Sequence, residues 1–399
     1  MRELPTGTVV FPLQLASALV DRSLLRSIQD GDENRLAMLE TIREYAAEQL
    51  VASGEEEAIR ARHAAHFRAL AERGAGVLTD PRRDELLDQL DRELANLRAA
   101  TRWSIETGEH ETGLVLVASL REFWHTRNHL TEARASLDAL LRVSGPDASL
   151  SRERAFEAAA ELASWQGDYA TSVSLAEQAL AMAEALGDRR GVAMAKNNVG
   201  WGNLRYRPDV ARGLFEEATA LAREMNAGDI LAGSLQGGAL SNLQLGDLET
   251  ARALAQEALD LAALSGETYV SSFNMLTLGV IDMRSGFRDA ALRRLREALR
   301  DSMHAGANIG AALALESVAN MALDLGEVER AAQLASAGER LRSEIGGGPT
   351  MAMGGWEEPL PRIRAVMDPA DLERALADGR ALTTEQAAAL AHEVGEPPA

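Results

Sequence analysis

Alanine and leucine recur at helical spacing along most of this chain, and the pattern itself returns at a longer interval. Residues 244–262, QLGDLETARALAQEALDLA, show the unit: a glycine followed by an acid, then alanines at positions 251 and 258 with leucines between them. Turn glycines align at Gly167, Gly246, Gly286 and Gly326, with the missing member near residues 206–208, so the period is 39 to 40 residues. An acid follows all of these glycines except Gly286. A fixed period of this length is the signature of a repeat protein.

Small residues occupy the same places in every unit and predict closely packed helices. The fifth residue after each turn glycine and the residue seven places further are small, and two helical turns put both on one face. These pairs are Ser172 and Ala179, Ala251 and Ala258, Ala291 and Ala298, and Ala331 and Gly338. Another small residue comes seven places before each turn, at Ala160, Gly200, Ala239, Gly279 and Ala319. Each unit is therefore predicted to be a helix, a turn and a second helix.

The connections between helices carry their own signals. Gly187, Gly228, Gly266 and Gly306 are expected to end the second helices, because glycine tolerates the left-handed conformation found there. Pro208 replaces the turn glycine in one unit and is expected to shorten that turn.

The repeat resembles the tetratricopeptide repeat, in a lengthened form of about 40 residues. We therefore predict an all-α, tetratricopeptide-like α-solenoid over residues 146–346. Residues 57–145 are predicted as helical pairs leading into it, with helices at 84–107 and 111–126 around Gly108 and a turn at Asn128. Residues 347–399 are predicted as a loop and two capping helices, at 361–377 and 384–394.

The first 56 residues do not share the repeat. Residues 24–29 and 35–39 are extended candidates on either side of a turn-rich stretch, which suits a hairpin. Thr41 followed by Glu44 has the spacing of a capping box at a helix start. The order helix, hairpin, helix predicts a winged-helix-like remnant over residues 1–56.

Five segments resemble bacterial signal-transduction ATPases of the NB-ARC, or STAND, class, including LuxR- and AfsR-like transcriptional regulators. The segments are LVDRSLL at 19–25, RLAMLETIREYA at 35–46, RHAAHF at 62–67, LANLRAATRW at 94–103 and LADGRALTTEQA at 376–387. In that family a nucleotide-binding module and a winged helix precede a tetratricopeptide sensor. The resemblance implies that this chain is the sensor half. The sequence holds no GxxxxGK[ST] loop, so we expect neither ATP hydrolysis nor a cofactor, and a nucleotide-binding domain would be a separate partner.

Composition narrows the classes of function. The net charge is −20, with 61 acids against 41 basic residues, and no basic cluster is evident, so nucleic acid is not an expected partner. Cysteine is absent, which favours a cytoplasmic protein. No run of 18 apolar residues predicts a membrane span. The alternative of secretion rests on the apolar stretch at 9–20, which Pro12 and Gln14 interrupt.

Candidate chemistry is sparse. Glu122, His125 and His129 have a spacing that could bind a metal ion, but ordinary packing is favoured, as it is for His63 and His66. The many carboxylates are explained by acid-rich helix surfaces. We therefore predict no catalytic residues and no metal site.

The inner surface of the predicted superhelix is the remaining candidate. In tetratricopeptide arrays, positions three before and one after the small residue of the first helix tend to face the concave groove. Here these are Glu157, Glu161, Asn197, Trp201, Gln236, Leu240, Leu276, Val280, Glu316 and Asn320. Such a surface suits a peptide or a small polar ligand, and the alternative is that these side chains are merely solvated.

The leading functional hypothesis is a non-enzymatic protein- or effector-binding module, the regulatory half of a transcriptional regulator. The alternative is a DNA-binding regulator that acts through residues 11–56. An enzyme with a site in the groove is the least favoured reading, since no activated nucleophile or cofactor cradle is evident.

Overall fold

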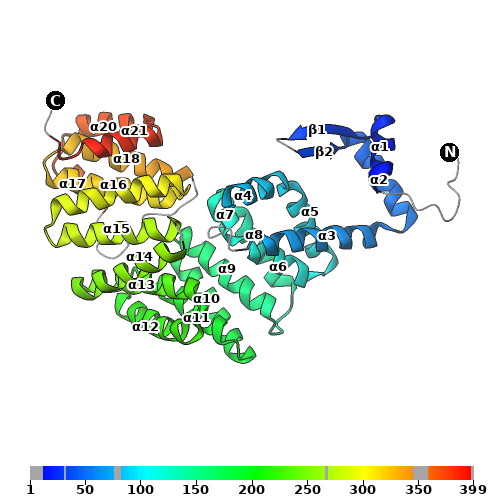
Figure 1. Cartoon of the computed structure of the whole chain (residues 1–399), viewed down its shortest axis with the longest axis horizontal. Helices are drawn as coiled ribbons and strands as arrows, with labels where there is room; N and C mark the ends of the chain where they lie inside the picture. Colours follow the sequence, from blue (N-terminus) through cyan, green and yellow to red (C-terminus); the bar gives the residue numbers. More distant parts are fainter. Residues whose placement is uncertain (1–11, 31–32, 76–81, 266–267, 345–357, 397–399) are drawn as a thin grey trace. The chain divides into compact units, whose positions relative to one another are not determined.

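The computed structural model describes residues 12–30, 33–75, 82–265, 268–344 and 358–396 (Figure 1). The chain divides into two compact units, residues 1–65 and residues 66–399. Helix α3 (Glu56–Arg73) contains the boundary between them.

The first unit has the predicted order of elements. Helix α1 (Pro12–Asp21) is followed by strands β1 (Arg26–Asp30) and β2 (Glu33–Ala37) and by helix α2 (Glu40–Ser53). The strands are antiparallel and pair Arg26 with Ala37 and Asp30 with Glu33, which makes the hairpin tighter than expected. The capping-box prediction at Thr41 is wrong, because the N-cap of α2 is Leu39, two residues earlier, and it makes no side-chain cap. The winged-helix assignment itself stays a prediction.

The segment before the array contains more breaks than its sequence predicted. The helices are α4 (Arg83–Arg92), α5 (Leu94–Thr107), α6 (His110–Ser119), α7 (Arg121–Thr126) and α8 (Leu130–Val143). The two helices expected at 84–107 and 111–126 are each divided, at Glu93 (φ −94°, ψ 3°) and at Leu120 (φ −96°, ψ 16°). Both residues adopt the sparsely populated bridge conformation, and neither is a glycine or proline that would have marked the break. The turns at Gly108 and Asn128 are confirmed, with φ of 82° and 62°.

The array consists of five helix pairs. They are α9 (Leu150–Trp165) with α10 (Tyr169–Leu186), α11 (Arg189–Asn203) with α12 (Pro208–Met225), α13 (Gly228–Leu245) with α14 (Leu248–Ser265), α15 (Thr268–Arg284) with α16 (Arg288–His304), and α17 (Asn308–Asp324) with α18 (Val328–Glu344). Each helix packs on the next, and the first helices of the pairs also contact one another in series (Figure 1). This is the predicted all-α, tetratricopeptide-like solenoid.

Small residues bring the helices together as expected. A Cβ atom added at Gly200 would lie 2.8 Å from the ring of Phe215, and one at Gly279 would lie 2.8 Å from Leu295. Ala160, Ala239 and Ala319 are fully buried at the equivalent positions. A larger side chain at any of these places would force neighbouring helices apart.

The glycine-acid turns have a simple physical basis. Gly246 adopts a left-handed conformation with φ of 88°, and Gly167, Gly286 and Gly326 do the same. Where an aspartate follows the glycine, it caps the second helix: Asp168 accepts a hydrogen bond from the Thr171 N–H at 3.3 Å, and Asp247 accepts one from the Thr250 N–H at 3.0 Å. Gly286 is followed instead by Phe287, which makes no side-chain cap. The recurring Gly-Asp pair therefore ends one helix and begins another.

Two predictions about connections are wrong and one lies outside the described residues. Gly228 does not end α12; the left-handed residue there is Asn226 (φ 53°), and Gly228 begins α13. Pro208 does not shorten its turn: it is the first residue of α12, and residues 204–207 make a four-residue connection. Gly187 and Gly306 are left-handed near the ends of their helices, as predicted, whereas Gly266 is not described.

Three helices close the far end of the array: α19 (Pro359–Arg364), α20 (Pro369–Ala381) and α21 (Thr384–Glu393). The single helix predicted at 361–377 is wrong, because Asp368 caps a new helix that starts at Pro369. Both α20 and α21 contact α18, and Ser336 donates a hydrogen bond to the Leu376 carbonyl at 2.8 Å. The loop predicted to start at residue 347 lies outside the described residues. The array is thus covered at its C-terminal end.

None of the helices in the described ranges is both long enough and apolar enough to span a bilayer.

Candidate functional site

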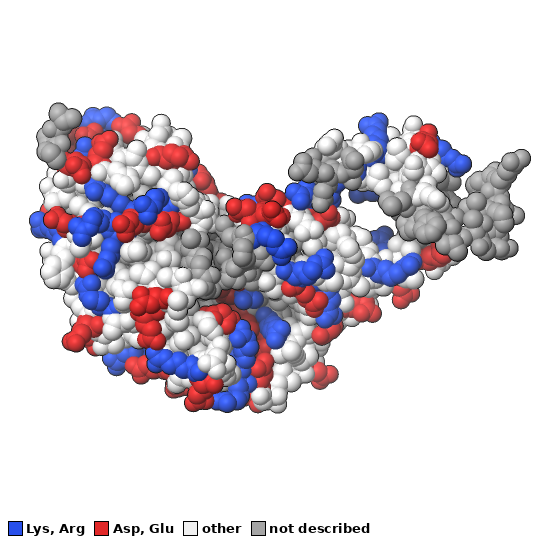
Figure 2. All heavy atoms as spheres, in the orientation of Figure 1, with Lys and Arg blue, Asp and Glu red and all other residues white. Residues whose placement is uncertain are grey.

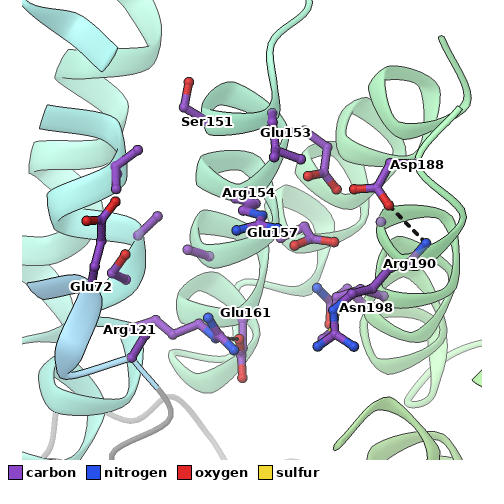
Figure 3. A pocket seen from close by; sticks show the side chains of 18 of the residues that line it. Glu72, Arg121, Ser151, Glu153, Arg154, Glu157, Glu161, Asp188, Arg190 and Asn198 are labelled. Carbon is purple, nitrogen blue, oxygen red and sulfur yellow. Dashed lines mark hydrogen bonds and ion pairs between the residues drawn. The ribbon is translucent and has the colours of Figure 1, made fainter. Parts of the chain in front are cut away.

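A pocket of about 520 Å³ lies within the second unit, where the array begins (Figure 3). Helix α9 forms one wall and the N-terminal part of α11 faces it. The end of α3, one face of α6 and Arg121 at the start of α7 complete the lining.

Acidic side chains outnumber basic ones in this lining. The acids are Glu72, Glu111, Glu153, Glu157, Glu161 and Asp188, and the arginines are Arg68, Arg121, Arg154 and Arg190. We call this cavity, defined by these ten side chains, the acidic pocket.

Three of the carboxylates form a stripe on α9. Glu153, Glu157 and Glu161 are spaced four residues apart, so one turn of the helix separates each from the next and all three share a face. Figure 3 shows Glu153 and Glu157 pointing towards α11. Like charges at this spacing repel one another, so the stripe destabilises the helix unless cations or protons compensate it.

Glu153 is the most enclosed member of the stripe, with 1% of its surface exposed. Neither of its carboxylate oxygens has a hydrogen-bond partner among the described residues. A Cβ atom added at Gly191 would lie 2.5 Å from Oε1 of Glu153, so the missing side chain of α11 leaves the space that this carboxylate occupies. Burial raises the pKa of Glu153, and the nearby Asp188 adds to the rise.

Glu157 and Glu161 differ in how their charge is compensated. Burial raises the pKa of Glu157 well above its usual range, and the neighbouring carboxyl of Glu153 raises it further. Burial also raises the pKa of Glu161, but Arg121 opposes the rise because its Nε lies 3.1 Å from a Glu161 oxygen. The stripe therefore has an ion pair at one end and uncompensated carboxyls at the other.

The α11 wall adds an amide with an unused donor. Asn198 has 6% of its surface exposed, and its Nδ2 has no hydrogen-bond partner in the part of the chain that the structure describes. Asp188 caps α11 by accepting from the Arg190 N–H at 3.0 Å. The guanidinium of Arg190 pairs instead with Asp229, at 2.5 Å.

On the side of the pocket formed by α3 and α6, the carboxylates have partners. Arg68 lies 3.3 Å from Glu72, one turn along α3. Ser151 donates a hydrogen bond to the Glu111 carboxylate, which links α9 to α6. The groups left without partners therefore concentrate between α9 and α11.

The predicted groove residues fall into separate places. Glu157 and Glu161 line the acidic pocket. Asn197 and Gln236 lie on α11 and α13 outside that lining, and Trp201 stands edge-on to Phe215, with the ring centroids 5.5 Å apart. Leu240, Leu276 and Val280 are buried in the core and cannot face a groove.

Glu316 and Asn320 are engaged in internal contacts at the other end of the array. An oxygen of Glu316 lies 2.8 Å from a guanidinium nitrogen of Arg342, and Asn320 accepts a hydrogen bond from Arg362 at 3.0 Å. The structure thus brings only two of the predicted groove residues, Glu157 and Glu161, into one described pocket. The ligand-binding role of the whole set stays a prediction.

The sequence pattern did not predict Glu153, Asn198 and Arg121 as site residues. Glu153 continues the four-residue spacing of Glu157 and Glu161, so a search for carboxylates on one helical face would have found it. Asn198 carries no comparable signal, because its importance depends on the helix that faces it.

The histidines considered as metal ligands have other surroundings. His125 is stacked on Trp165, with ring centroids 4.0 Å apart, and burial lowers its pKa to about 4. His129 instead lies edge-on to Trp124. Within the described ranges no three His, Asp or Glu side chains are placed to share a metal ion.

Comparison with known proteins gives a repeat family and a set of longer relatives. The family model "Tetratricopeptide repeat" matches residues 151–224, which include most of the α9 and α11 walls. Proteins named "Putative HTH-type transcriptional regulator" from Mycobacterium bovis and Mycobacterium tuberculosis are 33% identical to this chain over 298 residues, covering 71% of it and 33% of their own length.

Two solved structures are similar at low sequence identity. One is a Rap protein complexed with competence and sporulation factor, with a TM-score of 0.49 and 11% identity, covering 80% of this chain and 99% of that one. Another is a STAND protein with a tetratricopeptide repeat sensor from Pyrococcus horikoshii, with a TM-score of 0.45 and 14% identity, covering 94% and 58%. The chain therefore carries tetratricopeptide repeats and spans about a third of the length of the curated relatives it matches.

Proposed function

We propose that this chain is a non-enzymatic binding module that acts as the sensor or regulatory half of a STAND-type transcriptional regulator. The observation that carries the proposal is the acidic pocket, where Glu153 is almost fully buried and no described residue donates a hydrogen bond to its carboxylate. A buried carboxylate of this kind is costly unless something pairs with it. An effector or a partner segment that enters the pocket would supply the missing donor.

The repeat architecture supports a regulatory role for such binding. Helix α9 lines the pocket and packs on both α10 and α11, so a ligand held between α9 and α11 favours one spacing of the two helices over another. A ligand shifts an equilibrium between two arrangements by its difference in affinity for them. The names of the mycobacterial relatives are compatible with a transcriptional output.

The first unit supports a second partner, which we propose to be a nucleotide-binding domain outside this chain. Its larger apolar side chains include Ile28, Leu36, Tyr45 and Val51, which are half exposed or more, and Leu15, which is 49% exposed. Helix α2 has no buried residue at all. Ile28 pairs with Arg35 and Leu36 with Ser27, so these two side chains lie on opposite faces of the hairpin and the exposed residues are not one patch. Their exposure supports contact with a partner that covers more than one side of the unit.

Capture of partners from the native bacterium tests the module. The tagged chain is compared with a variant carrying Asn197→Ala, Trp201→Phe and Gln236→Ala, with a variant carrying Glu153→Gln and Asn198→Ala, and with the exposed control Glu177→Gln. We expect a partner or effector that is retained by the wild type and the control and lost from at least one of the other two. If both keep every bound molecule while their melting curves show them folded, the binding site has been misplaced.

The alternative function, direct DNA binding through residues 11–56, has a separate test. On the face that Figure 2 shows, basic and acidic side chains are interspersed rather than gathered into a basic patch. We expect no electrophoretic shift of random DNA at low salt. A shift that persists with random DNA and disappears on deletion of residues 1–56 would favour the alternative.

A further inference from the structure

We propose that the acidic pocket binds a cationic N–H donor, a guanidinium or a primary ammonium, that carries a hydrogen-bond acceptor nearby, as an arginine residue of a peptide does. This inference rests on the proposed binding function and names the ligand chemistry of the same site. It starts from the two carboxylate oxygens of Glu153 that have no partner in the described part of the chain.

The buried carboxyls of the stripe favour a positively charged ligand. Removing one ion of a buried pair leaves an uncompensated charge, which is strongly unfavourable, so a buried carboxylate without a partner favours any cation that can reach it. Glu157, one turn away, shares this environment, and one of its oxygens also lacks a partner among the described residues. The two carboxyls together can accept several hydrogen bonds from one ligand.

Several arginines of the pocket already form ion pairs with residues other than Glu153. Arg121 pairs with Glu161 at 3.1 Å, at the far end of the stripe from Glu153. Arg190 pairs with Asp229 and Arg68 with Glu72. Arg154 is exposed, and its charge lowers the pKa of Glu153 without overcoming the effect of burial. The protein's own cations therefore leave the Glu153 end of the stripe acidic.

The groups around the stripe favour a guanidinium that has a carbonyl oxygen nearby. A guanidinium presents five N–H donors in a planar fork that fits carboxylates, and it is more weakly hydrated than an ammonium. Asn198 faces the stripe from α11, and its Nδ2 can donate to a carbonyl oxygen. An arginine residue of a peptide has both the planar guanidinium and a backbone carbonyl oxygen. A polyamine offers the same cationic donors but no carbonyl.

Gly191 indicates that the position of Glu153 depends on the packing of α11. Any side chain there would collide with the carboxylate, since the nearest approach to a Cβ would be 2.5 Å. The carboxylate thus lies against the facing helix in a space that only glycine provides.

Calorimetric titration of the full chain tests the inference. The probes are a pentapeptide with blocked ends and a central arginine, the same peptide with the neutral isostere citrulline, and spermidine. We expect the arginine peptide to bind about tenfold or more tightly than the citrulline peptide, as the loss of a charged hydrogen bond implies. Equal binding of the arginine and citrulline peptides, with no binding of spermidine, overturns the proposal. Binding of spermidine without the arginine peptide overturns the requirement for an acceptor and assigns the cationic site to a polyamine.

Variants locate the site. Glu153→Gln should weaken the arginine peptide about tenfold or more, whereas Glu177→Gln, an exposed carboxylate on α10, should change nothing. Asn198→Ala should weaken the peptide but not spermidine. Gly191→Ala keeps every charge and should weaken both, because it displaces the Glu153 carboxylate. If Glu153→Gln binds the peptide as the wild type does, the cation does not meet this carboxylate and the proposal fails.

The two proposals fail separately. Comparing the arginine and citrulline peptides on the wild-type protein needs no variant, so a variant that does not fold cannot hide the result. If no cationic probe binds while partner capture is still lost in the variants described above, the binding module stands and only its cationic ligand is wrong.

Discussion

Single residues matter in this molecule as much for the side chains they lack as for those they carry. Phe215 is fully buried between two glycines of neighbouring first helices. The ring approaches the backbone of Gly237 so closely that a Cβ there would lie 2.3 Å from it, and Gly200 meets the same ring from α11. The two glycines thus admit a large aromatic side chain of α12 between α11 and α13.

Gly237→Ala should therefore destabilise the protein even though alanine is the better helix former. Overpacking of this kind costs about 1–3 kcal/mol. Gly213→Ala, in the interior of α12 with nothing within 4 Å of the added atom, is the matched control and should stabilise by roughly 0.5–1 kcal/mol. Urea unfolding followed by circular dichroism measures both, and a higher midpoint for Gly237→Ala would contradict this view of the packing.

The buried carboxylate of Glu316 makes stability depend on pH. Burial raises its pKa from 4.5 to about 7 despite the ion pair with Arg342. The folded state therefore binds this proton more tightly than the unfolded state does. The contribution is fully present below about pH 4.5 and is lost as the pH rises through about 7.

We expect the melting temperature of the wild type to fall between pH 5 and pH 8, and that of Glu316→Gln to fall less. Over this range the free energy of unfolding of the wild type should fall by at most about 3 kcal/mol more than that of Glu316→Gln. The exposed variant Glu177→Gln should keep the wild-type slope. Differential scanning calorimetry across this range decides the matter, and parallel curves for the wild type and Glu316→Gln would show that this carboxyl is not the source.

At the scale of the element, most described turns of the array depend on one residue with a positive φ, and the connection at residues 204–207 is the exception among them. Gly246 (φ 88°) ends α13, and Asn226 (φ 53°) has the same role after α12. Gly228, two residues later, has no positive φ and begins the next helix. The presence of a glycine near a helix end is therefore weaker evidence than its place relative to the turn.

Alanine substitution separates these positions. Gly246→Ala should cost about 1–2 kcal/mol through backbone strain alone, because no atom lies within 4 Å of the added Cβ. Gly228→Ala should be neutral or slightly stabilising, since it has equally open space and an ordinary conformation. Thermal melting of the two variants is the measurement, and equal losses would mean that the φ angle does not set the cost.

At the scale of the whole molecule, the C-terminal helices protect an apolar end. Ala387, Ala391 and Val394 are fully buried, and Arg296 on α16 donates a hydrogen bond to the Ala391 carbonyl at 3.2 Å. A terminal repeat of a solenoid packs against a neighbour on one side only. Its other side is apolar and needs such a cover.

Truncation after Leu382 should therefore lower the melting temperature and promote self-association. Light scattering with size-exclusion chromatography measures this. A control substitution on the exposed side of α20, Asp378→Ala, should leave the protein monodisperse to the same degree as the wild type. A truncated chain with unchanged scattering and melting would show that α21 is not a cover.

Much of this fold could be predicted from the spacing of small residues, because backbone contact between helices demands them at fixed intervals. The divisions at Glu93 and Leu120 could not, since no proline or glycine marks either position. The acidic pocket was predicted only in part, at Glu157 and Glu161. The positions predicted from Ala160, the small residue of α9, did not include Glu153. The burial of Glu153 depends on Gly191 and on other residues that are distant in the sequence.

The contact of each helix mainly with its immediate neighbours has a consequence for biosynthesis. Contacts that close short stretches of chain form quickly, and they do not wait for the far end of the polypeptide. As the chain leaves the ribosome, each hairpin of helices can settle on the one before it, and α9 is in place before the C-terminal cover has been translated. Assembly can therefore keep pace with translation, from the pocket outwards to the last turn.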